Sequence, residues 1–194
     1  MLERWPPVNG RRALDLACGT GRYTRLLIDS GARSVTALDF SAAMLRRVTD
    51  CPRIRANMMS LPFGSSVFDV VISGLAVGHA FSLLQWMSEV SRVLDTGGEL
   101  LYSDFHPEAA HAGLTRTFKD GQGHTYTLSH NAYDVASQTG AAGSVGFRIE
   151  AVQELRAGME VSEPFAGSEA FYRQWHGLPL VLIVRARKRA PCAD

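Results

Sequence analysis

Long hydrophobic runs, net charge and paired cysteines are all scarce in this chain of 194 residues. The longest apolar run, residues 180–184, is far too short to cross a bilayer, and residues 1–10 hold no apolar stretch of signal-peptide length. Twenty lysines and arginines against 19 aspartates and glutamates leave a net charge of +1, so no basic field favours nucleic acid or anionic lipid. We therefore expect a cytoplasmic protein whose partners include neither nucleic acid nor membrane.

Patterns of metal ligands and disulfides are equally sparse. Cys18, Cys51 and Cys192 are an odd, widely spaced set without a CxxC pair, which indicates neither a disulfide framework nor a zinc site. The histidines show no ligand spacing on a single element, so we expect no metal dependence. With 46% apolar and 20% charged residues, the chain is long enough for one domain, residues 1–194, with one site.

The sequence does contain an alternation of short apolar runs with helical patterns. Five runs, the third of them weaker than the others, are typical of strands buried on both faces of a parallel sheet; they cover residues 13–17, 34–38, 53–57, 67–73 and 99–103. The clearest helix covers residues 82–94, and Gly97-Gly98 is expected to stop it. Strand and helix in repetition predict a doubly wound α/β fold.

The alternation of strand and helix patterns ends at Phe105, and proline, glycine and histidine are frequent after it. We interpret residues 105–177 as containing a substrate-side insertion, with one extended piece at 124–128. Two further strands are expected at 147–153 and 180–187, and the second ends in a basic run that we interpret as a solvated terminus.

The first chemical feature is a buried strand that runs into a glycine turn and then a helix. Gly19 and Gly21 lack a Cβ atom, so the backbone can turn sharply there and a ligand can lie against it. The following helix presents free N–H groups to an anionic moiety. The dinucleotide fingerprint requires a third small residue where Thr24 stands, which argues against NAD, FAD and an oxidoreductase.

An acidic residue follows at the end of the second predicted strand. Asp39 stands where a carboxylate can accept hydrogen bonds from both hydroxyl groups of a ribose. Phe40, beside it, can stack on an adenine face. These two residues predict a nucleoside subsite next to the glycine turn.

Five segments occur in an order and spacing that one enzyme family shares. They are Asp15-Leu-Ala-Cys-Gly-Thr-Gly21, Ala37-Leu-Asp-Phe-Ser41 with Met44-Leu45, Asn57-Met-Met-Ser-Leu-Pro-Phe63, Phe68-Asp-Val-Val-Ile-Ser73, and Glu89-Val-Ser-Arg-Val-Leu94 with Gly97-Gly98. The chain thereby resembles class I, Rossmann-like S-adenosylmethionine-dependent methyltransferases of the small-molecule type 11 family. The resemblance implies a mostly parallel seven-stranded sheet with helices on both faces, an antiparallel last strand and a short N-terminal cap.

The same resemblance implies S-adenosylmethionine as the cofactor and S-adenosylhomocysteine as a product. The cofactor-binding residues that it implies are Asp15, Ala17, Cys18, Gly19, Thr20, Gly21, Tyr23, Asp39, Phe40, Met44, Asn57, Met58, Met59, Ser73, Gly74 and Leu75. Many relatives have an aspartate where Asn57 stands. Because an amide oxygen can still accept a hydrogen bond from the adenine amino group, we expect weaker or altered binding, not its absence.

Methyl transfer depends mainly on positioning, and a base is useful where the acceptor loses a proton. His79 follows the fourth predicted strand and His106 follows the fifth, so we expect both to point toward the crevice beside the cofactor. They are the candidate catalytic residues. The alternatives are packing or a loop hydrogen bond for His79, and loop ordering with Asp104 for His106.

The predicted function is methyl transfer to a small-molecule acceptor, such as a biosynthetic intermediate. The alternative is a non-catalytic, S-adenosylmethionine-binding regulatory or partner subunit. Only a short segment precedes the first strand, where relatives have a longer helical lid. We therefore expect residues 105–177, a homodimer partner or another subunit to complete the site. The acceptor, and whether its accepting atom is oxygen, nitrogen or carbon, stay open at this point.

Overall fold

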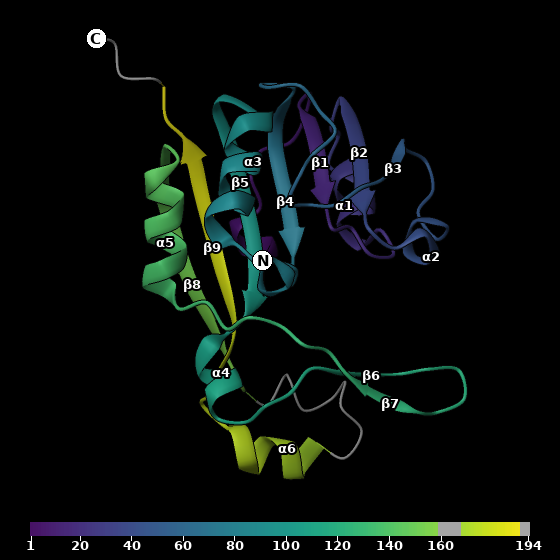
Figure 1. Cartoon of the computed structure of the whole chain (residues 1–194), viewed down its shortest axis with the longest axis vertical. Coiled ribbons are helices and arrows are strands. Elements are labelled where there is room, and N and C mark those ends of the chain that lie inside the picture. The colour runs from purple at the N-terminus through teal and green to yellow at the C-terminus, as the bar shows by residue number, and fades with distance from the viewer. Residues whose placement is uncertain (159–167, 191–194) are drawn as a thin grey trace.

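A computed structural model describes residues 1–158 and 168–190 of the chain (Figure 1). The first half contains η1 Leu2–Arg4, β1 Arg12–Leu16, α1 Arg22–Asp29, β2 Ser34–Asp39, α2 Ala42–Leu45, β3 Arg53–Arg55, β4 Phe68–Gly74, η2 Val77–His79, α3 Leu83–Val93 and β5 Leu94–Phe105. The second half contains α4 Pro107–His111, β6 Thr117–Lys119, β7 Thr125–Thr127, α5 Val135–Ser144, β8 Phe147–Arg156, α6 Ser168–Trp175 and β9 Pro179–Lys188.

Seven of these strands form one sheet in the order β3-β2-β1-β4-β5-β9-β8 (Figure 1). The five strands from β1 to β5 run parallel, whereas β9 is antiparallel to both of its neighbours, β5 and β8. The chain leaves β1 toward β2 and β3, then returns to the other side of β1 with β4. This reversal confirms the doubly wound fold and places the expected ligand crevice outside the carboxyl ends of β1 and β4.

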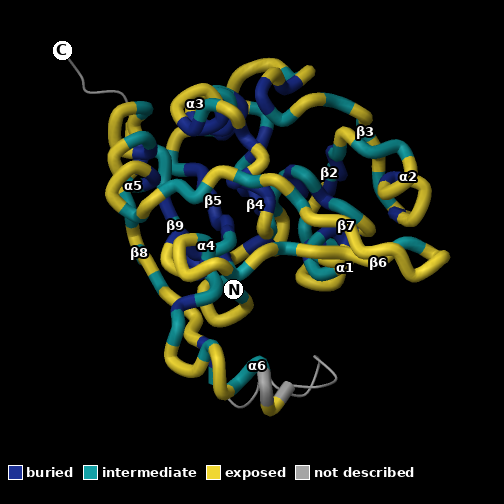
Figure 2. Tube along the Cα trace, turned by 60° about the horizontal axis from the view of Figure 1, so that its bottom comes forward, coloured by how far each residue is buried: buried dark blue, intermediate teal, exposed yellow. Residues whose placement is uncertain are grey.

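Alternate residues of the central strands pack against opposite helical layers. Leu14 shares one core cluster with Trp86 of α3, whereas its neighbour Ala13 shares another with Leu27 of α1. All four side chains are fully buried, and full burial of a leucine contributes about 2 kcal/mol. Figure 2 shows this burial concentrated in the strands and the inner side of α3. The two-sided core explains why the strands are continuous apolar runs in the sequence.

Helix α3 forms where the sequence predicted it, but its end differs. The Ser82 side chain caps it by accepting a hydrogen bond from the Gln85 backbone N–H. The helix ends at Val93, because Leu94 is already extended at φ −74° and ψ 141°. The glycine pair therefore does not stop the helix. It lies inside β5, where Gly97 has a φ of +76° and the pairing register with β4 shifts.

The extended piece predicted at 124–128 is confirmed as β7, which pairs with β6 in a small hairpin. This hairpin lies beyond the carboxyl ends of the parallel strands (Figure 1). The basic run at the chain's end is not simply a solvated terminus. Arg185 and Arg187 of β9 both form ion pairs with Glu99 of β5, whose side chain is fully buried. Arg11 reaches the same carboxylate at 2.8 Å.

Three further observations concern the described residues only. None of their helices is long and apolar enough to cross a membrane. Cys18 and Cys51 are free thiols, and Cys192 lies outside the described part of the chain. Residues 1–158 and 168–190 contain no group of three or more histidine, cysteine, aspartate or glutamate side chains placed to hold a metal ion.

Candidate functional site

The glycine turn after β1 uses backbone conformations that few residue types adopt. Ala17, Gly19 and Gly21 all have positive φ angles, of 56°, 55° and 84°. Gly21 is also the residue before α1, and a Cβ atom there would lie 3.0 Å from Cγ2 of Val48. The turn therefore needs glycine at position 21 for two reasons, its left-handed φ and its close neighbour.

Asp39, at the end of β2, holds this turn in place. Its Oδ2 atom accepts a hydrogen bond from the Gly19 backbone N–H at 2.8 Å, and its Oδ1 atom accepts one from the Ser41 backbone N–H at 2.8 Å. Each carboxylate oxygen has a further lone pair. Asp39 also lines a pocket, so those lone pairs can accept hydrogen bonds from hydroxyl groups of a ligand.

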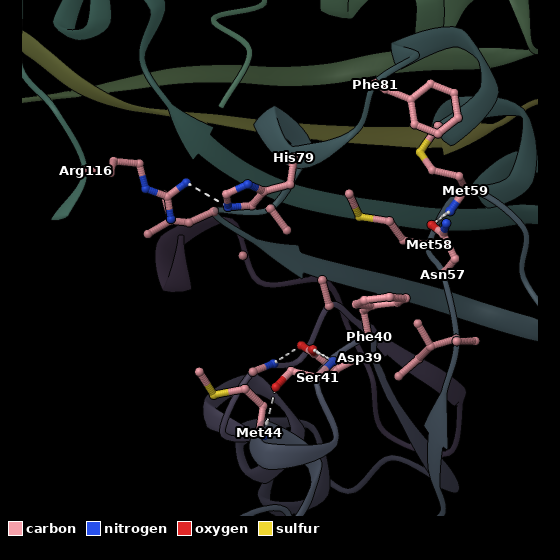
Figure 3. A pocket seen from close by; sticks show the side chains of 17 residues that line it. Asp39, Phe40, Ser41, Met44, Asn57, Met58, Met59, His79, Phe81 and Arg116 are labelled. Atoms are coloured by element: carbon pink, nitrogen blue, oxygen red, sulfur yellow. Dashed lines mark hydrogen bonds between the residues drawn. The ribbon is translucent and has the colours of Figure 1, made fainter. Parts of the chain in front are cut away.

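This pocket has a volume of about 580 Å³ and opens at the carboxyl ends of β1, β2 and β4 (Figure 3). A volume of that size suits a small molecule or a cofactor. Its lining residues are Ala17, Gly19, Leu38, Asp39, Phe40, Ser41, Met44, Ala56, Asn57, Met58, Met59, Gly74, Leu75, Ala76, His79, Phe81 and Arg116. Ten of the sixteen cofactor residues expected from the sequence are among them. The other six do not line the pocket: Asp15, Cys18, Thr20, Gly21, Tyr23 and Ser73.

Asp15 lies beneath the glycine turn and is fully buried. Its Oδ2 atom accepts a 2.6 Å hydrogen bond from the Thr24 hydroxyl, whereas its Oδ1 atom has no partner in the described part of the protein. Burial raises the pKa of Asp15 to about 6, although the Thr24 hydrogen bond opposes the shift and the charge of Asp39 adds to it. A buried carboxylate oxygen without a partner is costly, so this site suits a ligand that supplies a donor.

The other expected residues that do not line the pocket have different environments. Cys18 is buried, and burial raises the pKa of its thiol to about 12, which leaves it protonated and inert at neutral pH. Ser73 is buried in β4, and Thr20 is exposed. Tyr23 packs directly on Gly74, where a Cβ atom would lie 2.2 Å from the tyrosine ring, so this position requires glycine.

The opposite end of the pocket is formed by the segments after β2 and β3. The Phe40 ring is 70% exposed, and the Arg55 guanidinium lies 5.9 Å from its centre. The Asn57 Oδ1 atom accepts a 2.9 Å hydrogen bond from the Met59 backbone N–H. An exposed aromatic face next to an amide is suited to a flat heterocycle such as adenine.

Two unusual features lie beside the end of β4. Leu75 has a φ of 56°, a strained conformation for a residue with a side chain, and its N–H donates to the Ser103 carbonyl at 2.8 Å. His79 ends η2 and lines the pocket, with its Nε2 atom 3.5 Å from Nη1 of Arg116 (Figure 3). Burial first, and the charge of Arg116 second, lower the pKa of His79 below the ordinary histidine value, so the ring is neutral at pH 7.

His106 has a different environment. It is only 1% exposed, does not line the pocket and precedes α4, where its Nδ1 atom accepts a 3.2 Å hydrogen bond from the Glu108 N–H. Its Nε2 atom lies 3.5 Å from Glu154. The structure therefore gives it the position of a helix cap, and a role in proton transfer stays an untested prediction.

Several lining residues had no role in the predictions from sequence. Ser41 and Ala76 are neighbours in sequence of expected residues, and Phe81 follows His79 closely, so proximity could have suggested them. Arg116 is different, because it precedes β6 and belongs to the segment interpreted as an insertion. No local pattern marks it, and only the folding of residues 105–127 over the sheet edge brings it to the pocket.

Comparisons with known proteins agree with this architecture. Residues 14–102 match the model of a family described as a methyltransferase domain. The chain is 39% identical over 98 residues to a demethylmenaquinone methyltransferase of Corynebacterium urealyticum, a match that covers 50% of this chain and 42% of that protein. It is 32% identical over 145 residues to a malonyl-[acyl-carrier protein] O-methyltransferase of Pectobacterium atrosepticum, covering 71% of this chain and 56% of that protein. The chain spans about half the length of the curated relatives that it matches.

Solved structures show the same fold. An S-adenosylmethionine-dependent methyltransferase from Mesorhizobium loti superposes with a TM-score of 0.76 at 24% identity, covering 96% of this chain and 95% of that one. A methyltransferase of Haloferax volcanii, solved in complex with the Trm112 activator, superposes with a TM-score of 0.76 at 18% identity, covering 100% of this chain and 88% of that one. The fold is therefore that of class I methyltransferases.

Proposed function

We infer that this chain, whose residues 14–102 match the model of the methyltransferase domain family, binds S-adenosylmethionine and transfers its methyl group to a small molecule. The family is described as a methyltransferase domain, and the Mesorhizobium loti protein of the same fold is named as S-adenosylmethionine-dependent, which supports the same cofactor here. The observation that carries the proposal is Asp39, whose carboxylate binds the glycine turn and also lines the pocket. That arrangement suits a nucleoside whose ribose hydroxyls lie against the turn.

The residues fit the cofactor in three groups. We assign the methionine part to Ala17, Gly19 and Gly74, which line the pocket. Ala17 and Gly19 have left-handed backbone, and no atom lies within 4 Å of the place where a Gly19 Cβ atom would stand, which leaves room for a ligand there. The unpartnered Oδ1 atom of Asp15, directly below, suits an ammonium group reached through water. Asp39 receives the ribose, and the adenine is assigned to Phe40, Asn57 and Met58.

The cofactor supplies an activated methyl group on a sulfonium centre. The protein's own residues then position the acceptor and exclude water. We assign the proton-accepting role to His79 rather than His106, because His79 lines the pocket and its lowered pKa keeps it neutral at pH 7. S-adenosylhomocysteine and the methylated acceptor are the products.

The acceptor class is the finer part of the proposal. Relatives are named for demethylmenaquinone and for malonyl-[acyl-carrier protein], and one structural neighbour was solved with a Trm112 activator. We propose a small-molecule acceptor, and we propose that residues 105–177, a homodimer partner or a partner subunit complete the site. A non-catalytic, cofactor-binding subunit is the alternative, and Asn57 in the adenine position is the feature that favours it.

Calorimetric titration of S-adenosylmethionine and S-adenosylhomocysteine tests the proposal directly. We expect micromolar binding by the wild type and at least tenfold weaker binding by Asp39→Ala, a loss of about 1.4 kcal/mol or more. Asp29→Ala, at the exposed far end of α1, is the matched control and should bind normally. Absence of binding to the wild type would refute the proposed function. Binding without turnover on any acceptor, alone or with a partner protein, would favour the non-catalytic alternative.

A further inference from the structure

The pocket contains an arginine that the proposed cofactor site does not use. Arg116 precedes β6 and is half-buried, and its guanidinium points at His79 from the side opposite Asp39 and Phe40 (Figure 3). Its Nη1 atom lies 3.5 Å from the His79 Nε2 atom, a long hydrogen bond to a neutral group. The guanidinium carries five N–H donors, so most of its hydrogen-bonding capacity stays free for a ligand.

No carboxylate in the described residues forms an ion pair with Arg116. Asp104 is the acidic residue whose charge interacts with Arg116 without a direct contact. It lies in β5, is 1% exposed, and its Oδ1 atom has no hydrogen-bond partner among the described residues. Burial lowers the pKa of Arg116, which reflects the cost of removing its charge from water. Charges removed from water are normally paired, so the geometry favours an anionic ligand at this end of the pocket.

The chemistry of the neighbours selects the type of anion. A phosphate dianion is normally held by several cations or by a helix N-terminus. Here the pocket offers Arg116 and a neutral His79, with the acidic Asp104 close by, which suits a single negative charge. The planar guanidinium matches a carboxylate in a two-pronged geometry. Leu75 and Ala76, which line the same pocket, provide an apolar surface beside it.

We propose that Arg116 binds a carboxylate of the methyl acceptor, and that the apolar part of the acceptor lies against Leu75 and Ala76. This proposal rests on the proposed function, because it assigns the acceptor end of the same pocket. Arg116 is then a specificity-determining residue. A carboxylate that engages the guanidinium also draws it away from His79, which leaves the Nε2 atom free to accept a proton from the acceptor.

The test uses the protein loaded with S-adenosylhomocysteine and two ligands of the same shape, hexanoate and hexanamide. Chemical shifts in nuclear magnetic resonance spectra give the dissociation constants. We expect the wild type to prefer hexanoate by about tenfold, the size of a hydrogen bond to a charged group. The preference should disappear in Arg116→Gln and persist in part in Arg116→Lys. Lys119→Gln, an exposed position in the same hairpin that does not line the pocket, should keep it.

Each other outcome has a definite meaning. Equal binding of the two ligands, no binding of hexanoate at millimolar concentration, or a preference that survives Arg116→Gln would overturn the proposal. Tighter binding of hexyl phosphate than of hexanoate would also overturn it in favour of a phosphate acceptor. If Arg116→Gln weakens S-adenosylhomocysteine tenfold, the guanidinium holds the cofactor's own carboxylate instead. Failure of the wild type to bind S-adenosylhomocysteine refutes the proposed function, which is a separate result.

Discussion

Buried charged groups have ion-pair partners at one end of the central sheet and incomplete pairing at the other. Near the amino end of the parallel strands, Glu99 is fully buried and forms ion pairs with Arg11, Arg185 and Arg187. At the carboxyl end, Asp15 has a buried carboxylate oxygen without a described partner.

Two more charged groups at the carboxyl end share this incomplete pairing. The buried Asp104 has an unpartnered oxygen, and Arg116 has no ion pair among the described residues. From this contrast we propose that charges at the amino end stabilise the fold, whereas those at the carboxyl end bind ligands.

Removal of the paired charge should have the largest effect on stability. We expect Glu99→Gln to lower the free energy of unfolding by about 2 kcal/mol, because three guanidinium groups lose their shared partner. The value is below that for a fully buried pair because the three arginine side chains remain between 23% and 33% exposed. Urea unfolding measures the change, and affinity for S-adenosylhomocysteine should be unchanged.

Glu169→Gln provides the matched control for that measurement. Glu169 pairs with Arg173 on α6, but both side chains are about three-quarters exposed, so the change should be below about 1 kcal/mol. Equal effects of the two substitutions, or a loss of cofactor affinity in Glu99→Gln, would contradict the proposal that the charges at the amino end serve stability and those at the carboxyl end serve binding.

The carboxyl end should respond in the opposite direction. Asp15 has a pKa of about 6 in the folded chain, against an ordinary value of 3.8, so its contribution to stability is fully present below about pH 3.8 and is lost as the pH rises through about 6. Asp15→Asn removes the burial of a charge but leaves an amide donor unpaired. We expect a net gain in unfolding free energy of about 1 kcal/mol at pH 8, with weaker S-adenosylhomocysteine binding.

Urea unfolding of the ligand-free wild type and of Asp15→Asn at pH 4 and pH 8 measures this gain. The difference between the two proteins should be larger at pH 8, since the wild-type carboxyl group is then ionised. A variant that is less stable than the wild type at pH 8, or one that binds the ligand equally well, would show that Asp15 is part of the structural framework.

A smaller effect is expected where Arg116 meets His79. The groups that act on the imidazole are Arg116 and His130, which lower its pKa, and the Ser129 backbone, which raises it. Arg116→Gln removes one positive charge, so the pKa of His79 should rise by less than about one unit. Arg116→Lys keeps the charge and should leave it low. Titration of the His79 ring signals by nuclear magnetic resonance distinguishes these outcomes, and a pKa unchanged in Arg116→Gln would show that the two side chains do not interact in solution.

The smallest effect concerns the adenine end. Asn57→Asp introduces the carboxylate that the family resemblance implies at this position, and an aspartate can accept the hydrogen bond from the Met59 backbone N–H as the amide does now. We expect S-adenosylhomocysteine to bind about twofold more tightly, by about 0.5 kcal/mol, because a charged acceptor forms the stronger hydrogen bond with an adenine amino group. Calorimetry measures the change. Weaker binding in Asn57→Asp would mean that the base is recognised through another group.

Local sequence was sufficient for the parallel half of the sheet and for the glycine turn with its acidic neighbour. Apolar runs predicted the strands, because strands buried on both faces need apolar residues at every position. Gly19, Gly21 and Asp39 could be identified because a left-handed turn and a strand end restrict which residues fit. The prediction that the glycine pair stops α3 was wrong. Leu94 is already extended before that pair, and no residue type at that position forces a helix to stop.

Tertiary structure alone decided which distant groups meet. The sequence could not place Arg116 beside His79, 37 positions away, because the contact depends on how residues 105–127 cross the sheet edge. It likewise could not show that the basic run on β9 surrounds Glu99, since that depends on antiparallel pairing across 86 positions. Backbone conformation and side-chain periodicity are local properties, whereas the partners of a buried charge are set by the packing of the whole sheet.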